Sequence, residues 1–258
     1  MTKRKLIVFG TLFLMAMGVL LYACADKELE IEPAGTATTR AVEETVASKY
    51  YRILPGTSEW KSLETGADMW DASQLPDDML RDLSTEELVE ACMEFPMAYD
   101  YGAFADERIA ISDMINRFNG LTELARREDA GSYMIDAYRD INYTGKPFET
   151  YYNNTSVALS MAYIELLLMD DAFLKKMSKE ELKTLEQVAE DKYMHKLEHP
   201  EYFGLMNIKQ SLMVCAELAM ANDKSYNDEE RNRLIGYTRF YQYFPPEELT
   251  PISLLIFR

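Results

Sequence analysis

The sequence predicts an all-α protein, arranged as an irregular multi-helix bundle of paired helices. Apolar residues recur at the 3.6-residue spacing of helices through most of the chain. No continuous alternation of apolar and polar residues, which would indicate a strand, precedes residue 252. Two capping boxes, Ser84-Thr85-Glu86-Glu87 and Ser178-Lys179-Glu180-Glu181, mark helix starts. They open similarly but no fixed period links them, so an irregular bundle is favoured over a regular solenoid.

The N-terminus is typical of a lipoprotein signal peptide, predicted to occupy residues 1–23. Cations at residues 3–5 precede an uncharged apolar run over residues 6–21, which is the organisation of a secretory signal. The stretch Leu21-Tyr22-Ala23-Cys24 resembles a bacterial lipobox, although its second position usually holds a smaller residue. The cysteine of a lipobox, here Cys24, becomes the lipid-modified first residue of the mature chain. Two or more acyl chains hold a protein stably at a membrane.

Two other interpretations of this segment remain open. Cleavage after Ala25 would give a secreted protein without lipid, because Ala23-Cys24-Ala25 also fits the small-x-small pattern of cleavage sites. An uncleaved membrane anchor is the third interpretation, because Leu6–Ala25 just reaches the length needed to span a bilayer. The expected location is therefore the bacterial outer membrane or cell surface, with a periplasmic or secreted protein as the alternative.

Residues 24–40 are predicted to form a flexible tether between the lipid and the folded part. They contain Pro33 and Gly35 and almost no apolar side chains. Residues 41–258 are then expected to form a single all-helical domain. A polar loop with glycine and proline near residues 142–150 is the candidate point of sub-division.

The charge of the chain excludes one class of partner. The formal net charge is −17, from 44 acidic and 27 basic residues, and no basic run follows residue 5. Binding to a nucleic-acid backbone needs a basic patch, so no nucleic-acid partner is expected. The expected partners are the membrane, reached through the N-terminal lipid, and an envelope protein or a glycan.

The first half of the domain is predicted to be a series of short helices. They are expected over residues 41–54, 58–72, a short segment that starts at Pro76, 84–95, about 109–118, 121–127 and 130–141. In the second helix Trp60, Leu63, Ala67 and Trp70 fall on one face, which indicates a core face rather than a sugar-stacking platform. Asn119-Gly120 is expected to end the helix at about 109–118 in a left-handed conformation.

Residues 75–141 carry a set of short motifs. The motifs are Leu75-Pro76, Ser84-Thr85-Glu86-Glu87-Leu88, Phe95-Pro96-Met97, Phe118-Asn119-Gly120-Leu121, Glu123-Leu124 and Arg127-Glu128-Asp129. This stretch resembles a group of uncharacterised secreted lipoproteins of Bacteroidetes type, which the later helices resemble only loosely. The acidic residues that follow Cys24 also resemble the export signals of surface lipoproteins of that type. The resemblance implies an exported helical protein and names no reaction.

The second half of the domain is predicted to hold the core. Thr155–Met169 is apolar almost all round, with Glu165 as its only charge, and is too short to cross a bilayer. It is therefore expected to be the central buried helix. Further helices are expected over residues 178–199, 205–221 and 228–243, and Ile252–Phe257 is expected to be an edge strand or a segment docked on the helices.

The sharpest candidate site is His195-Lys196-Leu197-Glu198-His199, an H-x-x-E-H sequence that contains both histidines of the chain. In inverzincin metalloproteases this motif supplies two zinc ligands and a general base from one helix face. Pro200 opposes that function, because the residue before a proline is pushed out of the α region, which places His199 at or past the helix end. A third ligand is also required. A zinc-dependent hydrolase using His195, Glu198 and His199 is therefore only the alternative, and no metal is expected.

The remaining candidates each have a structural explanation. Cys92 and Cys215 lie in apolar helical patterns, which is typical of free buried cysteine. The pair Asp170/Asp171 has the composition of a glycosidase pair, but its place at the end of the buried helix favours solvated side chains. The Tyr-Tyr-Asn-Asn stretch at residues 151–154 favours half-buried packing over glycan or protein contact. No catalytic residue and no cofactor are assigned, and a non-enzymatic binding or assembly module is the leading hypothesis.

Overall fold

The computed structural model describes residues 48–141, 151–222 and 225–258 of the chain, with the side chains of 151–156 left out. All regular structure in these ranges is helical, which confirms the predicted all-α class. The predicted signal peptide at 1–23, Cys24 and the predicted tether at 24–40 lie outside the described residues, as does the predicted loop at 142–150. Within the described ranges, none of the helices is long and apolar enough to span a bilayer.

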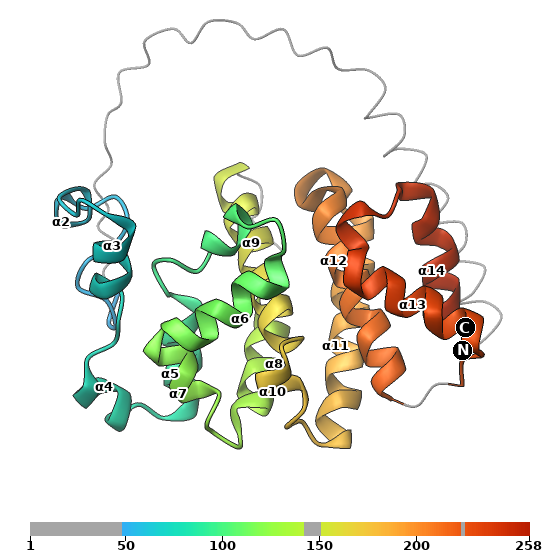
Figure 1. The fold of residues 1–258 in the computed structure, drawn as a ribbon, viewed down its shortest axis with the longest axis horizontal. Coiled ribbons are helices and arrows are strands. Elements are labelled where there is room, and N and C mark those ends of the chain that lie inside the picture. The colour runs from blue at the N-terminus through green and yellow to red at the C-terminus, as the bar shows by residue number, and fades with distance from the viewer. Residues whose placement is uncertain (1–47, 142–150, 223–224) are drawn as a thin grey trace, which may run out of the picture.

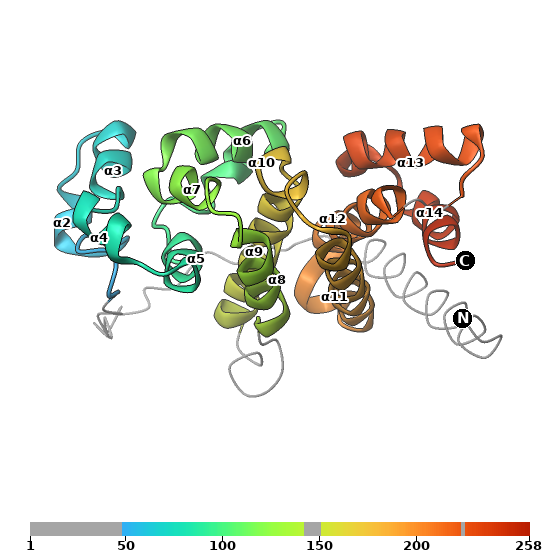
Figure 2. The same ribbon diagram turned by 90° about the horizontal axis from the view of Figure 1, so that it is seen from below.

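The helices follow one another in a row from one end of the molecule to the other (Figures 1 and 2). They are α2 (Ser58–Lys61), α3 (Gly66–Ala72), α4 (Asp77–Asp82), α5 (Thr85–Met93), α6 (Glu107–Arg117), α7 (Asn119–Leu124), α8 (Ala130–Asp140), α9 (Tyr151–Leu168), α10 (Asp171–Leu174), α11 (Lys179–Glu198), α12 (Pro200–Ala221), α13 (Asp228–Phe240) and α14 (Leu249–Ile256), with the 3₁₀ turns η1 (Asp100–Ala103), η3 (Tyr241–Tyr243) and η4 (Pro246–Glu248). Figure 2 shows α6 and α13 in one layer and α5, α8 and α11 in the other.

The helices α9 and α12 form the centre of the core. Every side chain from Met161 to Met169 is buried, which confirms the predicted central helix. The α12 segment Ile208–Ala216 is likewise buried throughout, and α12 packs against both α9 and α11. Gly204 interrupts α12 with φ 69°, a left-handed conformation that glycine adopts without strain. One apolar cluster runs from Tyr50 to Phe257, so the whole row shares a continuous core.

The first two predicted helices were wrong in their boundaries. Residues 48–54 are not helical, and the rest of the predicted helix at 41–54 lies outside the described residues. The Tyr51 hydroxyl donates to the Ala91 carbonyl at 2.7 Å, so a long-range contact holds this segment against α5. The stretch 58–72 is split into α2 and α3, because Thr65 starts a new helix with a capping box.

The expected apolar face over this stretch is consequently divided between two helices. Ala67 is exposed, whereas Trp60, Leu63 and Trp70 are half-buried. The Trp70 ring packs on Phe95 with the ring centres 5.3 Å apart. Trp70 thus has the predicted packing role, but at the edge of the core.

The helix predicted at about 109–118 ends next to Asn119-Gly120 as expected, but the left-handed conformation predicted there was wrong. The helix α6 ends at Arg117, and Asn119 begins α7. Gly120 is helical, and a Cβ atom placed there would lie 2.5 Å from the Phe118 ring and 3.0 Å from Leu75. Close packing, rather than a left-handed backbone, therefore requires the glycine.

The C-terminal segment is a helix rather than an edge strand. In α14 the side chains of Ile252 and Ile256 are buried against the rest of the core. The strand interpretation of residues 252–257 was therefore wrong, and the docked-segment interpretation is confirmed. The last long helix is shorter than predicted, since α13 ends at Phe240 and the 3₁₀ turn η3 continues to Tyr243.

Candidate functional site

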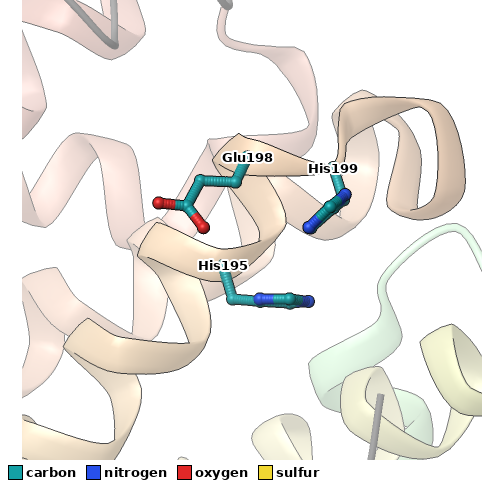
Figure 3. Close-up of side chains that lie close together, drawn as sticks. All are labelled: His195, Glu198 and His199. Atoms are coloured by element: carbon teal, nitrogen blue, oxygen red, sulfur yellow. The ribbon is translucent and has the colours of Figure 1, made fainter. Parts of the chain in front are cut away.

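The structure brings His195, Glu198 and His199 together at the end of α11. One potential ligand atom from each residue lies within 4.8 Å of the others. Figure 3 shows the three side chains projecting from this last turn, with the two imidazole rings beside each other. His199 has φ −131° and ψ 54°, and it is both the C-cap of α11 and the N-cap of α12. Its predicted position at the helix end, caused by Pro200, is confirmed.

The two imidazoles occupy different environments. Burial, followed by the charges of His199 and Lys192, lowers the pKa of His195 to about 4, so this ring is neutral at neutral pH. The Nδ1 atom of His199 lies 3.5 Å from the Glu201 carboxylate. The ring centres of His195 and His199 are 4.7 Å apart, and Phe203 packs edge-on against His195. Two imidazoles and a carboxylate are a ligand set that suits a divalent transition metal.

The same arrangement does not provide what a zinc hydrolase needs. Among the described residues, the group of metal-ligand side chains contains His195, Glu198 and His199 and no fourth member. If Glu198 ligates the metal, the group lacks a general base, and if Glu198 is the base, only two protein ligands remain. Glu198 is also exposed at the helix end. The geometry therefore favours metal binding over catalysis at these residues.

A second polar cluster lies in the middle of the core, around Glu165 of α9. Glu165 and Lys196 are both fully buried, and the Lys196 Nζ atom lies 2.9 Å and 3.1 Å from the two carboxylate oxygens. Tyr138 of α8 and Ser211 of α12 donate to Oε1 at 2.7 Å and 2.6 Å. Gln210 of α12 donates to Oε2 at 3.1 Å. Donors from three helices therefore surround the one carboxylate.

This cluster is a structural ion pair rather than a reactive group. Both oxygens of Glu165 accept hydrogen bonds, and neither Glu165 nor Lys196 reaches the surface. Burial lowers the pKa of Lys196, while Glu165 opposes that shift by stabilising the charged ammonium. The sequence assigned Glu165 no role. The available signal was its position as the only charge in an apolar helix.

An open groove with a volume of about 800 Å³ lies between α5, α8 and α9. We call it the acidic groove. Its carboxylates are Glu86, Glu90, Asp136 and Asp140, and its apolar wall is formed by Val89, Met93, Ala137, Ile141 and Val157. Arg139 also lines the groove, where it pairs with Asp136. The groove therefore presents more negative than positive charge, over an apolar wall.

A smaller groove of about 550 Å³ lies between α6, α12 and α13. At its wall the Arg108 guanidinium donates to the Glu217 carboxylate at 2.8 Å. Asp106 and Arg239 also line it, so its two acidic and two basic side chains balance, which leaves no net charge to attract a charged ligand.

The other predicted candidates have structural roles. Cys92 and Cys215 are buried and form no disulfide within the described ranges, and burial raises the pKa of the Cys92 thiol. Asp170 caps α10 by accepting from the Ala172 amide at 2.8 Å, and Asp171 pairs with Lys175 at 2.6 Å. The side chains of residues 151–154 lie outside those described. The two aspartates thus serve as a helix cap and as an ion-pair partner.

A scan against protein-family models found no match for this chain, and searches of curated proteins and of solved structures found none either. The resemblance of residues 75–141 to secreted proteins of Bacteroidetes type therefore stays a prediction.

Proposed function

We propose that this chain is a lipid-anchored, non-enzymatic binding module of the bacterial outer membrane or cell surface. The lipobox-like stretch that ends at Cys24 and the polar tether at 24–40 support the anchor and its location. The acidic groove supports the binding role, and it is the observation that carries the proposal. The partner is an envelope protein that presents a basic segment with apolar side chains.

The chemistry of the groove selects this partner. Glu86, Glu90 and Asp140 line one open cavity, with Val89 and Met93 beside them. Opposite charges steer a partner toward such a surface and fix its orientation, while apolar contacts supply most of the affinity. Exposed charge pairs are screened over roughly 8–10 Å at physiological salt, so binding weakens as the salt concentration rises.

The test is capture of the partner from solubilised envelope by the parent protein and by two charge-reversed variants. The groove variant is Glu86→Lys/Asp140→Lys. The control variant is Asp82→Lys/Glu180→Lys. Glu180, like Glu86, lies in the first turn of a helix, and Asp82, like Asp140, is the last residue of a helix, so both variants reverse two charges at matching positions. These control residues do not line the acidic groove.

A specific partner should be retained by the parent and by the control variant, and lost by the groove variant. Its retention should also fall with added salt. Equal retention by all three proteins would contradict the proposal. If the ligand is instead a neutral glycan, the parent and both variants should bind it equally well at every salt concentration. That result would also overturn the assignment of a basic protein partner.

A further inference from the structure

The junction of α11 and α12 gathers metal-ligand side chains at a single corner. His195 and Glu198 come from the last turn of α11, and His199 caps both helices. Their potential ligand atoms lie within 4.8 Å of one another. Tetrahedral coordination with donors at 2.0–2.2 Å places ligand atoms about 3.3–3.6 Å apart. Side-chain rotations that shorten the longest separation by roughly 1 Å are therefore sufficient to complete the set.

The surroundings single out one nitrogen on each imidazole. The Nε2 atom of His195 is buried, so we assign Nδ1 as the nitrogen that would bind the metal. The Nδ1 atom of His199 lies 3.5 Å from the Glu201 carboxylate, which leaves Nε2 for a metal ion. A carboxylate beside the second nitrogen of a ligating histidine fixes the orientation of the ring and strengthens its donor nitrogen.

The electrostatics of the corner favour a cation. The negative end of the α11 dipole meets the positive end of the α12 dipole at His199, so the two dipoles largely offset each other and the side chains decide the field. The Glu198 and Glu201 carboxylates add negative charge at this corner. Of the two neighbouring cations, Lys196 is buried and paired with Glu165 at 2.9 Å. Lys192, whose charge also acts on His195, donates to the Arg139 and Ile141 carbonyls at 2.9 Å and 3.1 Å.

We propose that His195, Glu198 and His199 bind one divalent transition-metal ion of the zinc class, which joins the last turn of α11 to the first turn of α12. Imidazole nitrogens favour Zn²⁺, Ni²⁺ and Cu²⁺ over Mg²⁺ and Ca²⁺, which prefer oxygen ligands. Glu201 links the site to α12, because it belongs to that helix. The site does not depend on the acidic groove, which α5, α8 and α9 line, so either proposal can fail without the other.

The first experiment follows a titration of the full chain with ZnCl₂ by calorimetry and by NMR of the imidazole groups. The protein is purified without a polyhistidine tag and kept in excess Ca²⁺, which occupies exposed carboxylates. Because the chain has 2 histidines, the imidazole signals report on His195 and His199 alone. We expect one equivalent of zinc to bind and both imidazole signals to change together. Zinc far below one equivalent, a change in one imidazole only, or loss of binding in Ca²⁺ would overturn the proposal.

The second experiment compares three variants with the parent. His195→Ala and His199→Ala each remove a ligand and should weaken zinc binding by about 100-fold or more, whereas Glu201→Gln should weaken it about 10-fold. The control is Glu180→Gln, an exposed carboxylate in the first turn of the same helix, which should bind as the parent does. Parent-like affinity in either histidine variant would contradict the site. If a histidine variant fails to fold, the titration of the parent decides alone.

Discussion

Glu165 is a carboxylate wholly inside the protein, held by hydrogen bonds from three other helices. An ionised carboxylate in an apolar core is strongly destabilising unless it is paired and hydrogen-bonded. Here Lys196 neutralises its charge, while Tyr138, Gln210 and Ser211 occupy its remaining acceptor positions. The bonds form only when α8, α9, α11 and α12 pack in this one register, so the cluster selects that packing.

Replacing Lys196 with methionine leaves the Glu165 charge buried without its cation. We expect Lys196→Met to lower the free energy of unfolding by about 3–5 kcal/mol, the usual cost of breaking a buried ion pair. Urea denaturation followed by circular dichroism at neutral pH measures this loss. Lys183→Met is the matched control, because Lys183 is an exposed residue of the same helix, and a change within about 0.5 kcal/mol is expected there.

The double variant Glu165→Gln/Lys196→Met separates the charge from the packing. Glutamine is neutral and still accepts hydrogen bonds from Tyr138 and Ser211, so the double variant should unfold at a higher urea concentration than Lys196→Met alone. Equal midpoints would mean that the lysine stabilises through its packing and not through its charge.

The two polar clusters differ in how much of them the sequence could predict. His195, Glu198 and His199 lie within five positions, so their proximity follows from helix geometry alone. The partners of Glu165 lie between 27 and 46 positions away. Local patterns cannot say which helix faces meet over such separations. The apolar residues around Glu165 predicted that its helix is buried. The hydrogen-bond donors that stabilise its buried carboxylate could be identified only in the folded structure.

At the scale of elements, helix starts were more predictable than helix ends. The capping boxes at Ser84 and Ser178 form as predicted, because all their atoms lie within a few residues of one another. The left-handed conformation predicted for Asn119-Gly120 was wrong, because both residues belong to α7 and Gly120 packs closely against the Phe118 ring. The apolar segment at residues 252–257 lies largely in helix α14. Packing against the core determines its conformation more than the pattern of apolar residues in so short a segment does.

Glycine-to-alanine substitutions in two helices should have opposite effects. At Gly120 the new Cβ would lie 2.5 Å from the Phe118 ring, and such overpacking costs about 1–3 kcal/mol. That cost exceeds the gain in helix propensity, which is at most about 1 kcal/mol. Gly236, in α13, has no heavy atom within 4 Å of an added Cβ, so only the gain applies.

We therefore expect Gly120→Ala to lower the thermal midpoint and Gly236→Ala to raise it. Differential scanning calorimetry of both variants measures the two shifts under the same conditions. A midpoint for Gly120→Ala that rises as much as that for Gly236→Ala would show that the α6–α7 junction has room for a methyl group.

At the scale of the whole molecule, the middle of the row was predictable and its ends were not. The central helices α9 and α12 are apolar almost all round, which indicates burial whatever their neighbours are. The helices keep their chain order along the row, but which of their faces meet depends also on contacts between non-consecutive helices, such as α9 with α12 and α5 with α8. The acidic groove lies between α5, α8 and α9.

The location of this groove in the cell rests on Cys24, which lies outside the described residues. Each buried methylene contributes about 0.8 kcal/mol, and two or more acyl chains hold a protein stably at a membrane. We expect Cys24→Ser to release the protein from the membrane fraction or to leave it unprocessed, while Ala34→Ser in the tether stays with the membrane as the parent does. Mass spectrometry of the parent should find an acylated N-terminal Cys24. An unmodified chain that begins at Asp26 would establish ordinary secretion instead, and unchanged fractionation of Cys24→Ser would favour the uncleaved anchor.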